Sequence, residues 1–243
     1  MKKIKIAVAQ IEVFDETDKN VKKILDFIGR ASFKNADIVC FPESCLGDSV
    51  LDIKSQRIKK IQEKCKKESI YCIIGAHIKD GNKVFNSAIL INRSGKIQYI
   101  YKKIHLFPKL DLKKTFPGKE NRVIETDFGK IAIIVCWDFA FPEDIRKLSK
   151  KGAQIIFCPS YLLNEAKISK EVFRSYPITR AFENLVYFVT CDAFTDEVLG
   201  ESYVCSPLKI LNKIKNREGI IFTELDLNKL VRLRKSYDGL GEK

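Results

Sequence analysis

Apolar segments of strand length alternate with amphipathic helical segments along most of the chain, and this alternation limits the fold more than any other feature. In the N-terminal half, apolar runs that predict strands cover residues 4–11, 37–41, 70–76, 84–92 and 97–103. In the C-terminal half, such runs cover residues 122–126, 130–136, 153–160, 185–192, 202–207, 209–214 and 219–226. Several of them are apolar throughout, which is typical of strands that are covered on both faces.

Apolar residues at helical spacing mark the segments between these strands. In the stretch 18–32, Val21, Ile24 and Ile28 fall on one face, which predicts an amphipathic helix. Further helices are predicted around 58–65, at 142–152 and at 169–184. Because no low-complexity linker interrupts the pattern, we predict a single α/β domain over residues 1–243, built on a mixed sheet.

Length and apolar content exclude some classes of protein. The chain has 243 residues, of which 45% are hydrophobic, so it can bury a substantial core. No apolar run approaches the roughly 20 residues that a membrane-spanning helix needs. The first residues, "MKKIKIAVAQ", lack the apolar core and the cleavage site of a signal peptide. We therefore expect a cytoplasmic protein with no membrane partner.

The cysteines and histidines do not form a metal-binding pattern. The eight cysteines are dispersed, most of them singly within apolar strands; no CxxC pair occurs and there are only two histidines. A zinc site needs clustered Cys and His at ligand spacing. We predict free buried thiols in a reducing compartment, with no metal and no organic cofactor.

The chain is basic, which raises the question of a nucleic-acid partner. Its formal net charge is +13, from 44 Lys and Arg against 31 Asp and Glu. The lysines are spread over the whole chain and form no dense tail or patch interleaved with aromatic residues. This distribution favours a solvated surface, and a basic nucleic-acid-binding protein is kept as a non-enzymatic alternative.

Three polar residues stand where predicted strands give way to turns. Glu43 follows the strand "DIVCF", Lys103 follows "IQYIYK", and Cys136 ends "KIAIIVC". In α/β proteins, active sites gather at strand ends. A thiol can attack a carbonyl carbon, a carboxylate can take the thiol proton, and an ammonium can stabilise the negative oxygen that forms. Together they predict nucleophilic catalysis.

The motifs around these residues resemble those of a known family. "FPES", "YKKIHLF" and "CWDFAFPE" occur in the order of the three signatures of the nitrilase superfamily of carbon–nitrogen hydrolases. That family carries a Glu–Lys–Cys triad, which corresponds here to Glu43, Lys103 and Cys136. Lys102 is the alternative lysine, but the family's lysine precedes the histidine by two places, which selects Lys103 before His105.

The resemblance covers nearly the whole chain and implies a fold and an activity. The fold is the nitrilase-type αββα sandwich, with mixed sheets flanked by helices, in a homodimer or a larger even-numbered assembly. The activity is that of a small-molecule amidase, ω-amidase-like or N-carbamoyl amidohydrolase-like, which forms a thioester on Cys136. Lys103 and the backbone N–H of Trp137 would hold the oxyanion. A nitrile hydrolase, an amine acyltransferase and a catalytically lapsed scaffold are the alternatives.

Several positions depart from the family pattern. Many members have a second glutamate after the lysine, whereas this chain has Asp111, which we predict to position the substrate or the lysine; Glu120 is a weaker contender. Ala140 replaces a common arginine, and Asp192 stands where an asparagine is usual. Nitrile hydrolases of the family typically have Trp-Glu after the cysteine, whereas here Trp137 is followed by Asp138. The resemblance therefore favours an amide or carbamoyl substrate over a nitrile.

Two further expectations concern the histidines and the pocket walls. We predict that His105 orients the lysine loop and that His77 is a surface or edge residue. We expect substrate specificity to come from the loops at residues 44–54, 106–120, 139–141 and 161–168.

Overall fold

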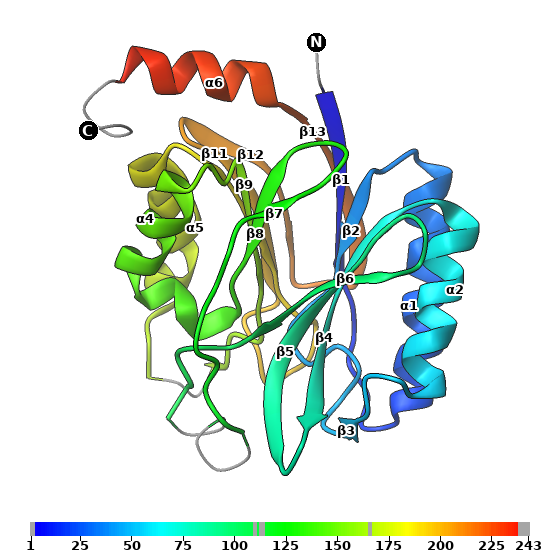
Figure 1. Ribbon diagram of the computed structural model, residues 1–243. Coiled ribbons are helices and arrows are strands. Elements are labelled where there is room, and N and C mark those ends of the chain that lie inside the picture. Colours follow the sequence, from blue (N-terminus) through cyan, green and yellow to red (C-terminus); the bar gives the residue numbers. More distant parts are fainter. Residues whose placement is uncertain (1–2, 109–110, 112–114, 165–166, 238–243) are drawn as a thin grey trace.

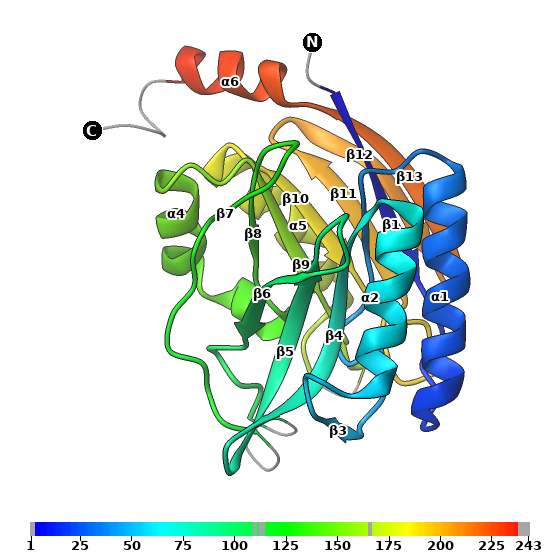
Figure 2. The ribbon, with the colours of Figure 1, turned by 45° about the vertical axis from the view of Figure 1, so that its right-hand side comes forward.

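The protein consists of two β-sheets packed face to face, with helices covering the outer face of each (Figures 1 and 2). The computed structural model describes residues 3–108, 111, 115–164 and 167–237. The layers are in the order helix, sheet, sheet, helix, so the predicted αββα sandwich is confirmed. The single mixed sheet that the strand pattern alone suggested is wrong, because the strands divide between two mixed sheets.

The first sheet has the order β13-β1-β2-β4-β5-β6, and β3 pairs with β4. Strands β1, β2, β3 and β4 run parallel to their neighbours in this group, whereas β13, β5 and β6 pair antiparallel. The strands are β1 (Lys3–Gln10), β2 (Ile38–Cys40), β3 (Val50–Leu51), β4 (Tyr71–Asp80), β5 (Lys83–Ile91), β6 (Ile97–Lys102) and β13 (Gly219–Asp226).

The second sheet has the order β12-β11-β10-β9-β8-β7. Its central strands β8, β9 and β10 are parallel, and the outer strands pair antiparallel. The strands are β7 (Ile124–Glu125), β8 (Lys130–Ile133), β9 (Ile155–Pro159), β10 (Tyr187–Cys191), β11 (Glu201–Ser206) and β12 (Lys209–Lys215).

Helices cover the outside of the sandwich. Figure 2 shows α1 and α2 side by side against the first sheet, while α4 and α5 lie on the second. The helices are α1 (Thr17–Phe33), α2 (Gln56–Glu68), α4 (Pro142–Lys150), α5 (Lys170–Asn184) and α6 (Leu227–Ser236). No helix in the described part of the chain is both long and apolar enough to cross a membrane.

The C-terminal helix α6 was not predicted from the sequence. It contains several basic residues and buries only two residues, Leu227 and Leu230. Asp226 caps its start by accepting a hydrogen bond from the Lys229 N–H at 3.0 Å. Arg234 then donates to the Ala153 carbonyl at 2.6 Å, which attaches the helix across the top of the second sheet (Figure 1). Such a helix depends on tertiary contacts more than on its own apolar face.

Strand β1 shows how the core is divided. Ile4, Ile6 and Val8 point into the core between the sheets, and the alternate residues Ala7 and Ala9 face the core under α1 and α2. Successive side chains of a strand point to opposite faces, so one strand supplies both layers. Because both of its faces are buried there, β1 is apolar without interruption from Ile6 to Ala9.

Candidate active site

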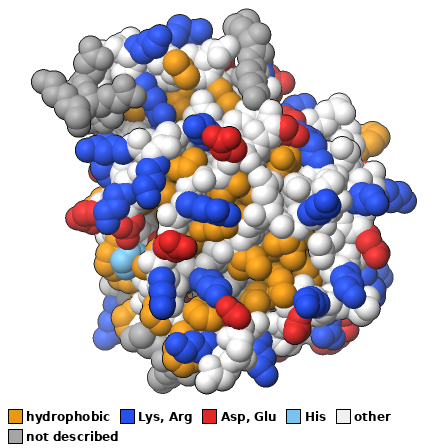
Figure 3. All heavy atoms as spheres, in the orientation of Figure 1, with side chains coloured by type: hydrophobic (Ala, Val, Ile, Leu, Met, Phe, Trp, Pro, Cys, Tyr) orange, Lys and Arg blue, Asp and Glu red, His pale blue; other side chains and the backbone are white. Residues whose placement is uncertain are grey.

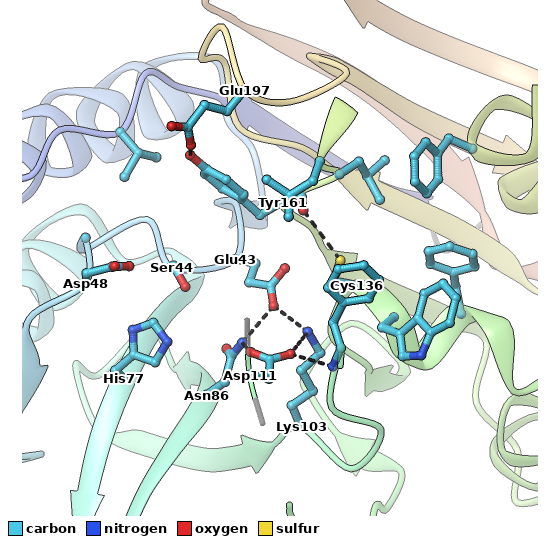
Figure 4. A pocket seen from close by; sticks show the side chains of 18 of the residues that line it. Glu43, Ser44, Asp48, His77, Asn86, Lys103, Asp111, Cys136, Tyr161 and Glu197 are labelled. Carbon is cyan, nitrogen blue, oxygen red and sulfur yellow. Dashed lines mark hydrogen bonds and ion pairs between the residues drawn. The ribbon is translucent and has the colours of Figure 1, made fainter. Parts of the chain in front are cut away.

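A pocket of about 330 Å³ lies between the two sheets, where several strands end. Glu43 follows β2, Lys103 follows β6, and Cys136 follows β8 after two further residues. All three side chains line this pocket, together with Asp111 (Figure 4). Glu43 and Lys103 come from the first sheet and Cys136 comes from the second, so the packing of the sheets brings the predicted triad residues together.

A close backbone contact holds Glu43 in place. The loop that carries it packs directly on β4 at Gly75, where an added Cβ would lie 2.5 Å from the Pro42 carbonyl oxygen and 2.8 Å from the Glu43 Cα. Only glycine fits at such a distance. The Gly75 N–H also donates to the Cys45 sulfur at 3.2 Å. The glutamate side chain is 4% exposed.

Lys103 is buried between two carboxylates. Its side chain is 2% exposed, and its Nζ lies 2.8 Å from Glu43 Oε1 and 2.6 Å from Asp111 Oδ2. Burial by itself would lower the pKa of Lys103, but the charges of Glu43 and Asp111 raise this pKa above its ordinary value. The side chain is therefore a charged ammonium at neutral pH.

The alternative lysine is not in this pocket. Lys102 pairs with Asp80 at 2.6 Å; the Lys102 side chain is 32% exposed, whereas that of Lys103 is 2% exposed. Neighbouring residues of a strand point to opposite sides, which separates Lys102 from Lys103. The choice of Lys103 from its spacing to His105 agrees with this geometry.

Asn86 connects the two carboxylates. Its Nδ2 donates to Glu43 Oε1 at 2.7 Å and to Asp111 Oδ1 at 3.0 Å. Oδ2 of Asp111 accepts a further bond from the Phe107 N–H at 2.9 Å. Burial would raise the pKa of Asp111, but Lys103 and these donors lower it below its ordinary value. The sequence offered a signal for Asn86, since it is a polar residue inside the apolar strand "VFNSAILI".

Cys136 lies on a sharp turn of the backbone. Its φ is +46°, a left-handed conformation that is uncommon for a residue with a side chain, and the short helix η1 (Cys136–Ala140) begins there. The sulfur lies 3.8 Å from the Tyr161 carbonyl oxygen. Burial raises the pKa of the Cys136 thiol and the charge of Glu43 raises it further, while Lys103 opposes them. The resting group is a neutral thiol.

Asp138 fixes this turn to the lysine loop. Its Oδ2 accepts from the Val135 N–H at 2.8 Å and from the Tyr101 hydroxyl at 2.8 Å, and its Oδ1 accepts from the His105 N–H at 2.9 Å. His105 itself stacks on Phe141, with ring centroids 3.5 Å apart. His105 thus contacts the turn after Cys136, which agrees with the prediction that it orients this loop.

The prediction for His77 is wrong. This residue is 8% exposed and lines the pocket, because β3 and β5 pair with β4 on both sides of it. His77 and Asn86 are register partners in β4 and β5. The sequence placed His77 after a strand, whereas β4 continues to Asp80.

Each predicted specificity loop contributes to the pocket, and other segments do so too. From the predicted loops come residues such as Asp48, Phe107, Phe139 and Tyr161. No role in the pocket was predicted from the sequence for the remaining lining residues, which are Val13, Phe14, Asp15, His77, Asn86, Phe173 and Glu197. They lie in the loop after β1, on strands β4 and β5, on helix α5 or in a loop that follows β10, and only tertiary packing brings them to the pocket.

Two departures from the family pattern have a structural explanation. Ala140 is absent from the described lining of the pocket and borders a surface groove beside α5. Asp192 is fully buried and accepts hydrogen bonds from the backbone N–H groups of Leu162, Ala193 and Gly200 at 3.0 Å each. Asp192 therefore ties the segment next to Tyr161 to the loop before β11.

The cysteines are all buried and free, as predicted. In the described part of the chain, no group of three or more His, Cys, Asp and Glu side chains could hold a metal ion.

Comparison with known proteins identifies the family. A model of the carbon-nitrogen hydrolase family matches residues 5–235. A nitrilase of Pyrococcus abyssi is 32% identical over 92% of this chain and 89% of its own length. Human omega-amidase NIT2 is 27% identical over 100% of this chain and 96% of its own. The crystal structure of Saccharomyces cerevisiae Nit3, of the nitrilase superfamily, covers 97% of this chain and 94% of its own with a TM-score of 0.86 at 24% identity. The chain belongs to the carbon-nitrogen hydrolase family of the nitrilase superfamily.

Proposed function

We propose that the protein is a small-molecule amidase that hydrolyses a linear amide or an N-carbamoyl compound through a thioester on Cys136. The observation that carries this proposal is the convergence of a buried thiol, a buried carboxylate and a buried ammonium in one pocket. The name of the human relative, an omega-amidase, and that of the archaeal relative, a nitrilase, both describe hydrolysis of carbon–nitrogen bonds and support it.

In this proposal, Glu43 is the general base. Its Oε1 is occupied by Lys103 and Asn86, which leaves Oε2 for the thiol proton. Because burial keeps the pKa of Cys136 high, the sulfur needs a base at the moment of attack. Glu43 takes the proton while the sulfur bonds to the carbonyl carbon and the carbonyl oxygen becomes an oxyanion.

Lys103 and the backbone N–H of Trp137 would stabilise that oxyanion. The ammonium is charged and held by two carboxylates, so it is oriented before the substrate arrives. The left-handed turn at Cys136 ends the extended chain after β8 and directs the chain that follows into η1, and the Cys136 side chain lines the pocket. Removing one oxyanion donor costs about 3 kcal/mol in other enzymes.

The remaining steps return the enzyme to its starting state. The tetrahedral intermediate collapses, the C–N bond breaks, and ammonia leaves with the proton from Glu43. Glu43 then takes a proton from water, whose oxygen attacks the thioester carbon. The C–S bond breaks, the acid is released, and the sulfur regains the proton from Glu43. Asp111 positions Lys103 throughout and stands in for the family's second glutamate.

The test follows both the thioester and the released ammonia. Intact-protein mass spectrometry with a slowly hydrolysed amide is expected to show an acyl adduct on the wild type and none on Cys136→Ala. Cys205→Ala, a buried free cysteine of β11, is the matched control and keeps the adduct. An adduct on the Cys136→Ala protein would contradict the assignment of the nucleophile.

A substrate panel separates this proposal from the alternatives. Ammonia release from amides and N-carbamoyl compounds supports the amidase, whereas turnover of nitriles alone would favour a nitrile hydrolase. An amine acceptor that captures the acyl group in place of water would indicate an acyltransferase. If no compound in the panel releases ammonia, the result would favour a scaffold that has lost its catalytic activity.

We also propose a single domain over residues 1–243 that assembles as a homodimer in the cytoplasm. Exposed apolar side chains at Phe182, Leu208 and Ile210 support an interface, and the free buried cysteines suit a reducing compartment. On the face shown in Figure 3, Lys and Arg are interspersed with acidic and neutral side chains, which argues against a nucleic-acid partner. Light scattering during size-exclusion chromatography should give twice the chain mass of 27.9 kDa, and the monomer mass would contradict the dimer.

A further inference from the structure

One peptide unit connects the Cys136 sulfur to a buried carboxylate outside the pocket. The carbonyl oxygen of Tyr161 lies 3.8 Å from this sulfur (Figure 4), and the N–H of the same peptide, which belongs to Leu162, donates to Asp192 Oδ1 at 3.0 Å. The peptide unit is planar and trans, so its C=O and its N–H point in opposite directions. A bond that fixes the N–H therefore also fixes the direction of the carbonyl towards the sulfur.

Asp192 is surrounded by hydrogen-bond donors. It is fully buried, and its Oδ1 accepts from the Ala193 N–H as well as from that of Leu162, at 3.0 Å each. Its Oδ2 accepts from the N–H groups of Gly200 at 3.0 Å and Glu201 at 3.4 Å. A backbone N–H donates and cannot accept, so these four partners suit an ionised carboxylate. None of them can accept the proton of a neutral carboxylic acid.

The segment 160–164 forms the wall of the pocket beside Cys136. Leu162 in this segment is bound on both sides, because its carbonyl accepts from the Leu199 N–H at 2.8 Å while its own N–H donates to Asp192. The bond to Leu199 does not involve the carboxylate. Loss of the Asp192 charge therefore loosens the peptide next to the sulfur while the segment stays attached to the loop before β11.

Burial decides the pH at which Asp192 carries its charge. It raises the pKa of Asp192 from an ordinary 3.8 to about 7, and the four backbone N–H donors oppose this rise. The side chain is therefore a carboxylate above pH 7 and takes up a proton as the pH falls below 7.

The titratable groups on the elements around Asp192 form no ion pair with it in the described part of the chain. Cys191 of β10 is a neutral thiol, because burial raises its pKa well above the ordinary value. Gln10 of β1 is a neutral amide that donates to the Gly200 carbonyl at 2.9 Å. The charged groups of β11 and of the loop before it are bound in two separate sets, Glu201 with Arg174, Lys215 and Tyr203, and Glu197 with Tyr161.

We infer that Asp192 is a positioning residue for the reaction: its carboxylate holds the peptide between Tyr161 and Leu162 so that the Tyr161 carbonyl keeps the Cys136 sulfur in place, and the protonated acid releases this peptide. The inference rests on the proposed function, in which Cys136 is the nucleophile. An asparagine at this position has one acceptor oxygen, and its NH₂ group cannot accept from the other N–H donors. The carboxylate therefore gives the site a dependence on pH that an asparagine does not give.

The first experiment compares the wild type with Asp192→Asn. Ammonia release from valeramide gives kcat/KM between pH 5.5 and 8.5, and groups that titrate in both proteins cancel in the ratio of the two values. Wild type over variant should be about tenfold at pH 8.5, as expected for a small displacement at the reacting centre, and should fall to about one at pH 5.5. A ratio that does not change with pH would overturn the inference, because a merely structural role gives that result.

The matched control is Asp226→Asn. Asp226 also accepts a hydrogen bond from a backbone N–H at 3.0 Å, but it does so at the start of α6, away from the pocket. This variant should have the kcat/KM of the wild type at every pH.

A second experiment needs no variant, so it also covers the case in which Asp192→Asn does not fold. Amide hydrogen exchange of the wild type, measured by NMR and corrected for the intrinsic effect of pH, gives the protection of the Leu162 N–H. This protection should fall about fivefold between pH 8 and pH 6, because the acceptor is lost. The Ser160 N–H, which donates to the Cys191 carbonyl at 2.8 Å, is the internal control and should keep its protection. Equal protection of Leu162 at both pH values would overturn the inference.

Failure of the proposed function gives a different result. If neither valeramide nor any other amide releases ammonia, alkylation of Cys136 by iodoacetamide takes the place of turnover. Rates that differ between wild type and Asp192→Asn by at least threefold at pH 8.5, and agree at pH 6, support the positioning of the sulfur in a protein that is not an amidase. Equal rates at both pH values would overturn it.

Discussion

The ammonium group of Lys103 lies 2.6 Å from Oδ2 of Asp111, a shorter distance than the 2.8 Å that separates it from Glu43 Oε1. Both carboxylates are also held by Asn86. Glu43 is therefore not the sole counterion of the lysine, and in the proposed mechanism its second oxygen acts as the base. The aspartate performs this task with a side chain one methylene shorter than a glutamate.

Replacing Asp111 tests that relationship. Asp111→Asn should lower kcat by about 10- to 100-fold, because the ammonium of Lys103 is then paired with Glu43 alone and is less firmly positioned for the oxyanion. Steady-state ammonia release measures the loss, and Asp111→Glu should restore most of it. The control is Asp80→Asn, which removes the exposed partner of Lys102 at the same 2.6 Å. A normal kcat in Asp111→Asn would show that the aspartate is dispensable.

Replacing Glu43 separates base catalysis from thiol reactivity. Glu43→Gln should reduce amide turnover by about 10²- to 10⁴-fold. The rate of iodoacetamide alkylation at Cys136 should stay equal or rise, because the charge of Glu43 raises the pKa of the thiol and its removal lowers that pKa. Alkylation needs the thiolate, so in the wild type its rate should climb with pH through pH 9. Parallel loss of turnover and alkylation would indicate a misfolded pocket.

The close approach at Gly75 predicts a steric effect on Glu43. Gly75→Ala places a Cβ 2.5 Å from two backbone atoms of the glutamate loop, which must move. We expect a stability loss of about 1–3 kcal/mol and a decrease in kcat of at least tenfold. Gly29→Ala is the matched control, since its Cβ meets only the flexible end of the Lys64 side chain, at 3.2 Å. Urea unfolding and ammonia release measure the two effects.

A buried carboxylate in the second sheet predicts acid sensitivity. Glu201 is 1% exposed and pairs with Arg174 at 2.7 Å and Lys215 at 2.8 Å, and it also accepts from the Tyr203 hydroxyl. Burial would raise the pKa of Glu201, but these partners lower it to about 2 from an ordinary 4.5. Its stabilisation is complete above pH 4.5 and is lost as the pH falls towards 2, because the unfolded chain takes up the proton first.

Glu201→Gln should therefore flatten the dependence of unfolding free energy on pH between 4.5 and 2. It should also lower that free energy by about 2 kcal/mol at neutral pH, because charged hydrogen bonds are lost. The control is Glu224→Gln, which removes an exposed pair with Lys3 at 3.7 Å and should cost under about 1 kcal/mol. An unchanged pH slope in Glu201→Gln would contradict the role of this cluster.

Much of the secondary structure could be read from local patterns. The apolar run at residues 37–41 predicted a strand buried on both faces, which is β2, and the spacing of Val21, Ile24 and Ile28 predicted α1. The pairing of strands could not be read in this way. β1 pairs with β13, more than 200 residues further along, and no local signal specifies a partner at that distance.

The misreading of His77 has the same cause. A polar residue after an apolar run is typical of a strand end, so the sequence indicated an edge position. In the protein, β3 and β5 flank β4 at this residue, and His77 lies in the pocket beside Asn86. Burial depends on neighbours that the local sequence does not contain.

By itself, the sequence determined the family and most of the order of the strands and helices. It also determined the candidate residues Glu43, Lys103 and Cys136, because each of these three residues lies in a short motif at a strand end. Only the tertiary structure decided that these residues meet. Glu43 and Lys103 leave one sheet and Cys136 leaves the other, and they converge because the sheets bury their apolar inner faces against each other.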